Sequence, residues 1–351
     1  MYIEKINSPK DIKELSVEQL SVLAEEVRTA LIRKLSEHGG HIGPNLGMVE
    51  TTIALHYVFN SPIDKIVFDV SHQSYVHKML TGRMAAFLDP AKYDDVTGYT
   101  NPDESEHDFF TIGHTSTSVS LAMGLAKGRD LTGGKENIIA VIGDGSLSGG
   151  EALEGLNNAA MLGSNMIIIV NDNDQSIAEN HGGLYKGLKE LRDTNGESPD
   201  NIFKAMGLEY YYLGDGHDVS ALIKLFTSVK DIDRAVVLHI HTIKGKGLKY
   251  AEENKEYWHA GGPFHIEDGS PKGPGWPVNE TVRESVLDLI EKRSDVVAIT
   301  AGTPSVIGFT EDYRKRAGKQ FVDVGIAEEH AVAMASGIAR NGGTPIFGVF
   351  S

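Results

Sequence analysis

The chain has 351 residues, a formal net charge of −16 and no cysteine. Its length is sufficient for two domains, and the lack of cysteine excludes disulfides, thiolate catalysis and metal sites built from cysteine. The acidic charge argues against nucleic acid or an anionic membrane as a partner, and no apolar run is long enough to span a membrane.

A long helix is predicted close to the N-terminus. Residues 1–16 are charged and lack the apolar segment of a secretory signal, so together with the missing cysteines they predict a cytoplasmic protein. Ser16 followed by Gln19 forms a capping-box pattern, and apolar residues then recur at helical spacing until Gly39. His41 lies in the next segment, HIGPNLG, which is predicted to be a loop, and it is a candidate site residue.

Histidines also follow a short strand that is predicted at Lys65–Val70. His72 comes directly after this strand, and α/β enzymes keep their chemistry at the carboxyl ends of strands. His77 could belong to the same site, but it is more simply interpreted as a surface residue of the next helix. Residues 89–107 are polar and rich in turn-forming residues, which predicts a surface excursion that covers the site.

The sequence GHTSTS at residues 113–118 opens another predicted helix. Amides and hydroxyls at the N-terminus of a helix can bind an anion or a polar ring. An ordinary Ser/Thr cap would explain the hydroxyls, but it would not explain the pair Gly113 and His114. These residues are therefore candidates for ligand binding.

Residues 137–180 predict a crossover unit of strand, turn, helix, strand and turn. The first strand, Asn137–Ile142, ends at Gly143-Asp144-Gly145, and the second, Met166–Val170, ends at Asn171-Asp172-Asn173. Continuous apolar strands joined by a helix indicate a buried parallel sheet. The two polar turns should therefore lie side by side, at the edge where open α/β sheets bind ligands.

Asp144 and Asn173 could together bind a divalent cation. A carboxylate and an amide oxygen are hard ligands suited to Mg²⁺ or Ca²⁺, and Mg²⁺ with few protein ligands usually completes its shell with phosphates. Glycines beside Asp144 let a ligand approach the backbone. Two ordinary polar turns are the alternative, but both turns in one crossover unit favour a site for a metal-bridged diphosphate.

Beyond this unit, residues 182–200 are predicted to be a loop and Val219–Val229 a helix. A further strand, Ala235–Ile240, ends in the turn HTIKGKG at residues 241–247. The amides and lysines of this turn could hold phosphate, although the spacing is not that of a P-loop. Residues 261–277 are rich in glycine and proline and predict a linker.

A second α/β pattern follows. It comprises predicted helices at Thr281–Lys292 and Phe309–Lys315 and predicted strands at Val296–Thr300, Phe321–Val324 and Pro345–Phe350. These strands would form too small a sheet for a complete domain. We therefore predict a diphosphate-binding domain at residues 1–262, a linker at 263–278 and the start of a second domain at 279–351.

Taken in order, these motifs resemble the 1-deoxy-D-xylulose-5-phosphate synthase branch of the transketolase-like thiamine-diphosphate enzymes. The resemblance runs from about residue 36 to the end and rests on the following segments: GGHIGPNLGMVETTIALHYVFN, FDVSHQSYVHKMLTGR, GHTSTS, GDGSLSGGEALEGLNNA, NDNDQSIAEN, DGHD, HTIKGKGL, AEENKEYWH and FVDVGIAEEHAVAMASGIA. It implies an α/β fold with a parallel thiamine-diphosphate-binding sheet, two consecutive domains of which the second is incomplete, and a homodimer.

The resemblance also implies a role for each matching residue. Thiamine diphosphate and Mg²⁺ would be the cofactors, with Mg²⁺ held by Asp144, Asn173 and the backbone carbonyl of Gln175. Residues that would contact thiamine diphosphate are His72, Gly113, His114, Thr115, Gly145, Ser146, Asn173, Leu248 and Glu328. Glu328 would hydrogen-bond the aminopyrimidine ring and act as a catalytic residue, together with His41, His72 and His259.

The implied reaction joins pyruvate to glyceraldehyde 3-phosphate with loss of CO₂ and yields 1-deoxy-D-xylulose 5-phosphate, a precursor of isoprenoids, thiamine and pyridoxal. Four positions depart from the family pattern, which usually has glycine, methionine, tyrosine and glutamine at Ser71, Gln175, Leu248 and Glu329. Two alternatives therefore stay open: a related transfer with another donor and acceptor, and an inactive cofactor-binding paralogue. The joint presence of Asp144, Asn173 and Glu328 argues against the second.

Overall fold

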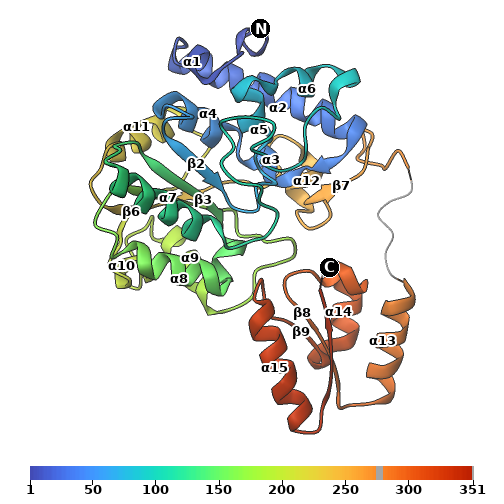
Figure 1. The fold of residues 1–351 in the computed structure, drawn as a ribbon. Helices are drawn as coiled ribbons and strands as arrows, with labels where there is room; N and C mark the ends of the chain where they lie inside the picture. Colours follow the sequence, from blue (N-terminus) through green and yellow to red (C-terminus); the bar gives the residue numbers. More distant parts are fainter. Residues whose placement is uncertain (274–279, 350–351) are drawn as a thin grey trace.

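The computed structural model describes residues 1–273 and 280–349, which form two α/β bodies (Figure 1). The larger, N-terminal body is built on a five-stranded parallel sheet with the strand order β2-β3-β4-β6-β5. The smaller body has a three-stranded parallel sheet with the order β10-β8-β9. The predicted class, a parallel-sheet α/β fold, is confirmed.

The strands are β1 (Gly40–His41), β2 (Lys65–Phe68), β3 (Ile138–Gly143), β4 (Met166–Asp172), β5 (Glu209–Leu213), β6 (Ala235–His241), β7 (Ala260–Gly261), β8 (Val296–Thr300), β9 (Phe321–Asp323) and β10 (Thr344–Gly348). The α-helices are α1 (Pro9–Ile12), α2 (Val17–His38), α3 (Gly43–Gly47), α4 (Val49–Val58), α5 (Tyr75–Lys78), α6 (Ala85–Leu88), α7 (Ser118–Thr132), α8 (Gly150–Ala159), α9 (Gly183–Asp193), α10 (Ile202–Ala205), α11 (Val219–Val229), α12 (Lys249–Glu253), α13 (Glu280–Lys292), α14 (Glu311–Ala317) and α15 (Glu328–Arg340). Short turns of other helix types are η1 (Ile3–Lys5), η2 (Met79–Arg83), η3 (Pro90–Lys92), η4 (Gly145–Ser148), η5 (Pro304–Ile307) and η6 (Gly318–Gln320).

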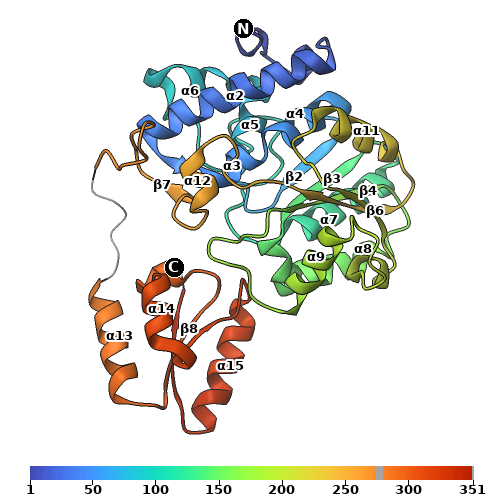
Figure 2. The same cartoon turned by 180° about the vertical axis from the view of Figure 1, so that it is seen from behind.

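Helices cover both faces of the larger sheet, as its continuous apolar strands predict. Alternate residues of β3 face opposite layers: Ile138, Ala140 and Ile142 pack with α7 and α8, whereas Ile139 and Val141 pack with α4 and α11. Figure 2 shows the sheet between these two layers. Burial of strands on both faces holds their carboxyl ends in fixed positions, and the site is built on those ends.

Helix α2 forms an outer layer over α4, and its N-terminus has the predicted capping box. The Ser16 Oγ accepts a hydrogen bond from the Gln19 amide at 3.3 Å, and the Gln19 Oε1 accepts one from the Ser16 amide at 2.8 Å. The helix ends at Gly39, whose φ of 82° favours glycine. The chain then enters β1, which pairs with β7 in an antiparallel ribbon.

Two local predictions in the first part of the chain need correction. The segment HIGPNLG is not a loop, because His41 belongs to β1 and Gly43 begins the short helix α3, in which Pro44 is the second residue. Strand β2 ends at Phe68 instead of Val70, because Val70 and Ser71 adopt φ values of 58° and 67°. The pairing of β1 with β7 joins residues far apart in sequence, so no local pattern could reveal it.

The prediction of a loop over residues 182–200 is also wrong. Helix α9 covers its first part and buries Tyr185, Leu188 and Leu191 against the sheet. Their spacing of three residues is that of a helical face, but neighbouring glycines and charges concealed it. The edge strand β5 was not predicted either, because only Tyr210 of its residues is fully buried.

The predicted linker at residues 263–278 begins too early. Phe264 is buried against Trp258, with ring centroids 4.8 Å apart, and it forms an isolated β-bridge with Pro271. Residues 274–279 lie outside the described residues, as does Phe350 at the predicted end of the last strand. The other elements predicted after the linker agree with α13, β8, α14, β9 and β10 to within the usual variation at element ends.

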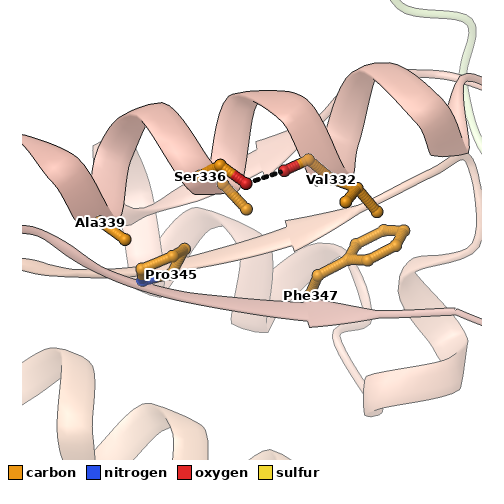
Figure 3. Close-up of a pocket in the computed structure, with 6 residues that line it drawn as sticks. Val332, Ser336, Ala339, Pro345 and Phe347 are labelled. Carbon is orange, nitrogen blue, oxygen red and sulfur yellow. Dashed lines mark hydrogen bonds between the residues drawn. The ribbon is translucent and has the colours of Figure 1, made fainter.

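In the smaller body, α15 lies over β10 with an apolar hollow of about 360 Å³ between them (Figure 3). It is lined by Val332, Ala335, Ser336, Ala339, Pro345 and Phe347. Val332 is 55 % exposed, and β10 is an edge strand of its sheet. This open apolar surface supports the prediction of an incomplete second domain, which stays a prediction. Among the described residues, no helix is long and apolar enough to cross a membrane.

Candidate active site

The two polar turns of the crossover unit lie next to each other, as predicted. Strands β3 and β4 are parallel neighbours, with Gly143 opposite Asn171. The Asp144 amide donates a hydrogen bond to the Asn171 carbonyl at 3.1 Å. The carboxyl ends of these two strands therefore bring Asp144 and Asn173 to the same edge of the sheet.

Asp144 is buried, with only 1 % of its surface exposed. Its Oδ2 accepts hydrogen bonds from the Gln175 amide at 3.1 Å and from the Asn180 Nδ2 at 2.6 Å. Burial, reinforced by the charge of Asp172, raises the pKa of the Asp144 carboxyl to about 7. Because ionisation of this buried carboxyl group is unfavourable, a cation bound beside it would stabilise its charged form strongly.

Asn173 supplies the second oxygen of this donor set. Its side chain is buried, and its Oδ1 has no hydrogen-bond partner among the described residues. Buried amide oxygens normally accept a hydrogen bond, so this free oxygen is a candidate ligand for a metal ion. The Gln175 side chain turns to the Ile177 carbonyl at 3.3 Å, and the metal role of the Gln175 backbone carbonyl stays a prediction.

Gly145 and Ser146 form a close-packed turn after Asp144. A Cβ added to Gly145 would lie 2.9 Å from the Cβ of Ser176, so no side chain fits there. The Ser146 carbonyl accepts a hydrogen bond from the Ser116 Oγ at 2.8 Å. This contact joins the turn to the GHTSTS segment.

Asp69 holds that segment in place, and sequence reasoning missed it. The buried Asp69 carboxylate accepts hydrogen bonds from the Ser116 amide at 2.8 Å and the Ser118 amide at 2.9 Å. Burial raises the pKa of Asp69, which the two amide bonds oppose. Its only signal in the sequence was a carboxylate near a strand end. Gly113 and His114 are exposed, and the His114 Nδ1 lies 3.0 Å from the Thr115 carbonyl, so cofactor contacts of Gly113, His114 and Thr115 stay predictions.

The three histidines that the resemblance implies come together. The ring centroids of His41 and His72 are 5.1 Å apart, those of His72 and His259 are 5.3 Å apart, and those of His41 and His259 are 5.9 Å apart. The pairing of β1 with β7 brings His41 beside His259, because His41 lies opposite Ala260. Asn45 fixes the third member, since its Nδ2 is 2.8 Å from the carbonyls of both His41 and His72.

These histidines are neutral at physiological pH. Burial lowers the pKa of His41 to about 4 and lowers the pKa values of His72 and His259 well below the usual range, helped by neighbouring positive charge. The Nδ1 atoms of all three are buried, and none has a hydrogen-bond partner among the described residues. Neutral rings with free nitrogens can accept or donate protons to a substrate that reaches them.

Lys244 adds a buried cation that the sequence only hinted at through its Gly/Lys-rich turn. Its side chain is 2 % exposed, and its Nζ donates a hydrogen bond to the Ser176 carbonyl. Burial lowers the pKa of Lys244 to about 7, while the charge of Asp144 opposes this shift. Lys244 also lowers the pKa values of His72 and His259, so it links the histidines electrostatically to the Asp144 turn.

His77 does not lie where it was expected. His77 is fully buried, not a surface residue: its Nδ1 lies 2.9 Å from the Nε2 of His56, and its Nε2 lies 2.9 Å from the Oδ1 of Asp108. A polar residue on an apolar helix gave no sign of these distant partners. Leu248 packs into the hydrophobic cluster of α2, where it offers only apolar contact, and its predicted cofactor contact stays untested.

Glu328 begins α15 in the smaller body. The turn before it contacts the Asp144 turn, because the Ser148 Oγ donates a hydrogen bond to the Ile326 carbonyl at 3.1 Å. Within residues 1–273 and 280–349, the Glu328 carboxylate makes no hydrogen bond or ion pair with the histidines. The structure therefore brings its turn to the site but leaves its role with the aminopyrimidine ring a prediction.

Charged contacts also join the two bodies. Arg314 donates hydrogen bonds to both carboxylate oxygens of Glu256 at 3.0 Å, and its Nη2 lies 3.5 Å from Glu179. His181 lies 3.9 Å from Asp323. Both Glu179 and His181 belong to the loop that follows Asn173, so this loop lies between the Asp144 turn and the smaller body.

Comparison with known proteins gives a consistent result. A family model described as 1-deoxy-D-xylulose-5-phosphate synthase matches residues 3–198 and 194–242. Curated proteins of that name from Carboxydothermus hydrogenoformans and Clostridium beijerinckii are 39 % and 40 % identical to this chain, over 99 % of the chain and 62 % of each relative. The chain thus spans about three fifths of the length of these relatives.

Solved transketolases share the fold. The structure from Campylobacter jejuni matches with a TM-score of 0.56 and 16 % identity, over 96 % of this chain and 66 % of that one. The structure from Leishmania mexicana matches with a TM-score of 0.54 and 15 % identity, over 96 % of this chain and 64 % of that one. At such low identity the likeness concerns the fold alone.

Proposed function

This chain belongs to the 1-deoxy-D-xylulose-5-phosphate synthase family, and from that premise we propose that it acts in the thiamine-diphosphate-dependent condensation of pyruvate with glyceraldehyde 3-phosphate. The products are 1-deoxy-D-xylulose 5-phosphate and CO₂. The proposal includes Mg²⁺ as the metal, a homodimer as the assembly and the cytoplasm as the compartment. The homodimer rests on the family resemblance, and the compartment rests on the lack of cysteine in this sequence.

The observation that carries the proposal is the donor set of Asp144 and Asn173. A buried carboxylate with a raised pKa lies at the same sheet edge as a buried amide oxygen that has no hydrogen-bond partner in the described part of the chain. A hard divalent cation would satisfy both at once. We propose that these two side chains and the Gln175 carbonyl hold Mg²⁺, while the narrow turn at Gly145 and Ser146 admits the diphosphate.

When bound, thiamine diphosphate supplies the electron sink for decarboxylation and carbon–carbon bond formation. The residues of this chain orient the reactants and manage protons. His41, His72 and His259 are neutral and buried, so each can take a proton from a substrate hydroxyl and later return it, or donate a hydrogen bond to a carbonyl oxygen. Glu328 would hold a proton at its carboxylate next to the ring of the cofactor, and the covering segment 89–107 would exclude water.

A related transfer with another donor and acceptor is the second candidate. It is favoured by Leu248, because an apolar side chain in the α2 cluster cannot provide the hydroxyl of the tyrosine usual in the family. Ser71, Gln175 and Glu329 are further departures around the same region. An inactive paralogue is disfavoured, because the protein keeps Asp144, Asn173 and Glu328 together.

Two measurements test the proposal. Incubation with thiamine diphosphate, Mg²⁺, pyruvate and glyceraldehyde 3-phosphate should release CO₂ and form a deoxysugar phosphate. CO₂-free transfer from a ketose phosphate would support the second candidate instead. Calorimetric titration with thiamine diphosphate and Mg²⁺ reads binding independently: Asp144→Ala should abolish it, whereas the exposed control Asp193→Ala should not. Unchanged binding by Asp144→Ala would contradict the metal assignment.

A further inference from the structure

A second hollow adjoins the histidine cluster and contains a buried lysine; we name it the Lys34 cavity. Its volume is about 440 Å³, within the usual range for small-molecule pockets of about 300–1,000 Å³. Its walls come from the C-terminal end of α2, the ribbon of β1 and β7, and the covering segment at residues 93–99. Because His41 both lines this cavity and belongs to the histidine cluster, a molecule in the cavity would lie beside the proposed reacting centre.

Lys34 carries a charge that its surroundings do not neutralise. Its side chain is 4 % exposed, and its Nζ donates hydrogen bonds to the carbonyls of Ala86 at 2.8 Å and Tyr93 at 3.1 Å. The Nζ also lies 4.2 Å from the centre of the Phe87 ring. An ammonium group has three N–H donors, so one remains after the two carbonyls. Buried charges are normally paired, yet no described carboxylate lies within 4.0 Å of this nitrogen.

Asp94 and Glu104, the acidic residues whose charges act on Lys34, have other partners. Asp94 lies 2.8 Å from the Nε2 of His38, and Glu104 forms ion pairs with Lys78 and Arg83. Burial and the charge of Lys78 lower the pKa of Lys34 to about 8, which Asp94 and Glu104 oppose from a distance. The lysine therefore remains mostly protonated at neutral pH, and an anion in the cavity would supply the missing countercharge.

We propose that the Lys34 cavity binds a phosphate group, either free or at the end of a small phosphorylated substrate. The second case rests on the proposed function, since that reaction has a phosphorylated acceptor. The Lys34 ammonium would make a charge-assisted hydrogen bond to a phosphate oxygen. Tyr99, whose ring centroid is 5.6 Å from that of His41, lines the cavity together with His41.

Lys13 provides a matched control for a purely structural role of Lys34. The Lys13 Nζ also donates hydrogen bonds to two carbonyls, those of Tyr57 at 2.8 Å and Phe59 at 3.0 Å. Lys13 does not line the cavity. If Lys34 only ties elements together, replacement of either lysine by glutamine should have the same consequences.

The experiment is a titration of the protein with inorganic phosphate, followed by calorimetry, for the wild type, Lys34→Gln, Lys13→Gln and Lys34→Arg. We expect Lys34→Gln to weaken phosphate binding by at least about tenfold, the loss typical of a hydrogen bond to a charged group. Lys13→Gln should bind phosphate as the wild type does, and Lys34→Arg should retain binding because it keeps the charge. Thermal melting confirms that each variant is folded, and Lys34→Arg keeps the test informative if Lys34→Gln does not fold.

Competition distinguishes the two sources of phosphate. Displacement of inorganic phosphate by glyceraldehyde 3-phosphate, but not by glyceraldehyde, would assign the cavity to the substrate. Binding of inorganic phosphate that neither compound displaces would assign it to free phosphate. Failure of the wild type to bind phosphate, or equal affinity in Lys34→Gln, would overturn the inference. Neither result depends on CO₂ release, so a failure of the proposed reaction is recognised separately.

Discussion

Replacement of Asp144 by asparagine should stabilise the metal-free protein and remove its stabilisation by Mg²⁺. Burial, with repulsion from Asp172, raises the pKa of this carboxyl from 3.8 to about 7. The folded state therefore holds the proton more tightly than the unfolded state does, and ionisation of Asp144 costs folding free energy. Asparagine keeps a side-chain oxygen that can accept a hydrogen bond, but it carries no charge.

The magnitude follows from the shift. Below pH 3.8 the Asp144 carboxyl is protonated in both the folded and the unfolded state, so it does not lower the stability. Between pH 3.8 and about 7 the unfolding free energy of the wild type falls as the pH rises, and above pH 7 the full destabilisation is present. Each pKa unit corresponds to about 1.4 kcal/mol, so the shift from 3.8 to about 7 gives an upper bound of about 4 kcal/mol. We expect Asp144→Asn to be more stable than the wild type by about 2–4 kcal/mol at pH 8, on the same basis.

Urea unfolding in the presence of a chelator, at pH 5 and pH 8, measures this difference, which should be larger at pH 8. Addition of Mg²⁺ and thiamine diphosphate should then raise the melting temperature of the wild type and leave that of Asp144→Asn unchanged, because only a ligand that binds the folded state stabilises it. The exposed Asp193→Asn serves as the control at both steps. A metal-free variant that is less stable than the wild type at pH 8 would refute the reasoning.

Four further substitutions probe other parts of the molecule. Phe226→Ala, in the core between α11 and the sheet, should lower the unfolding free energy by about 3–5 kcal/mol in urea denaturation; a loss below 1 kcal/mol would contradict the packing. Asp69→Ala leaves two buried amides unbonded, so we expect a loss of about 1–3 kcal/mol and faster proteolysis of residues 113–118. Ser71→Gly relieves about 1 kcal/mol of strain from the left-handed backbone but removes two buried hydrogen bonds of about 1 kcal/mol each. We therefore expect the variant to melt at a slightly lower temperature than the wild type, and a higher melting temperature would contradict this balance. Arg314→Ala breaks the bidentate contact with Glu256 and should increase the radius of gyration in X-ray scattering without lowering the melting temperature of the larger body.

The sequence predicted those features that depend on local patterns. Strands β3 and β4 were evident because continuous apolar runs ended at polar turns, and parallel pairing then placed Asp144 beside Asn173. The capping box of α2 was equally local, since Ser16 and Gln19 lie on one turn of helix. In both cases neighbours in sequence determine the structure.

Features that depend on distant partners could not be predicted in this way. Asn45 joins the carbonyls of His41 and His72, and Asp69 binds amides at residues 116 and 118. Both residues lie in segments that carry the family resemblance, but no local pattern reveals what they contact, because only the fold brings their partners to them. His77 was misjudged for the same reason, since its buried partners are His56 of α4 and Asp108, which are distant in sequence.

The turn after β2 shows how a departure from the family pattern can be accommodated. Val70 and Ser71 both have left-handed φ values, and Ser71 replaces the glycine that such a conformation favours. The Ser71 Oγ offsets this cost by donating a hydrogen bond to the Ile112 carbonyl at 3.0 Å and accepting one from the Thr100 amide at 3.0 Å. Thr100 belongs to the segment 89–107 and Ile112 directly precedes the GHTSTS segment, so this serine ties both segments to the strand end that precedes His72. Ser71 therefore has a local compensation for its strained backbone, whereas Leu248 makes apolar contacts in the cluster of α2, so we expect the proposed reaction to be more sensitive to substitution of Leu248 than of Ser71.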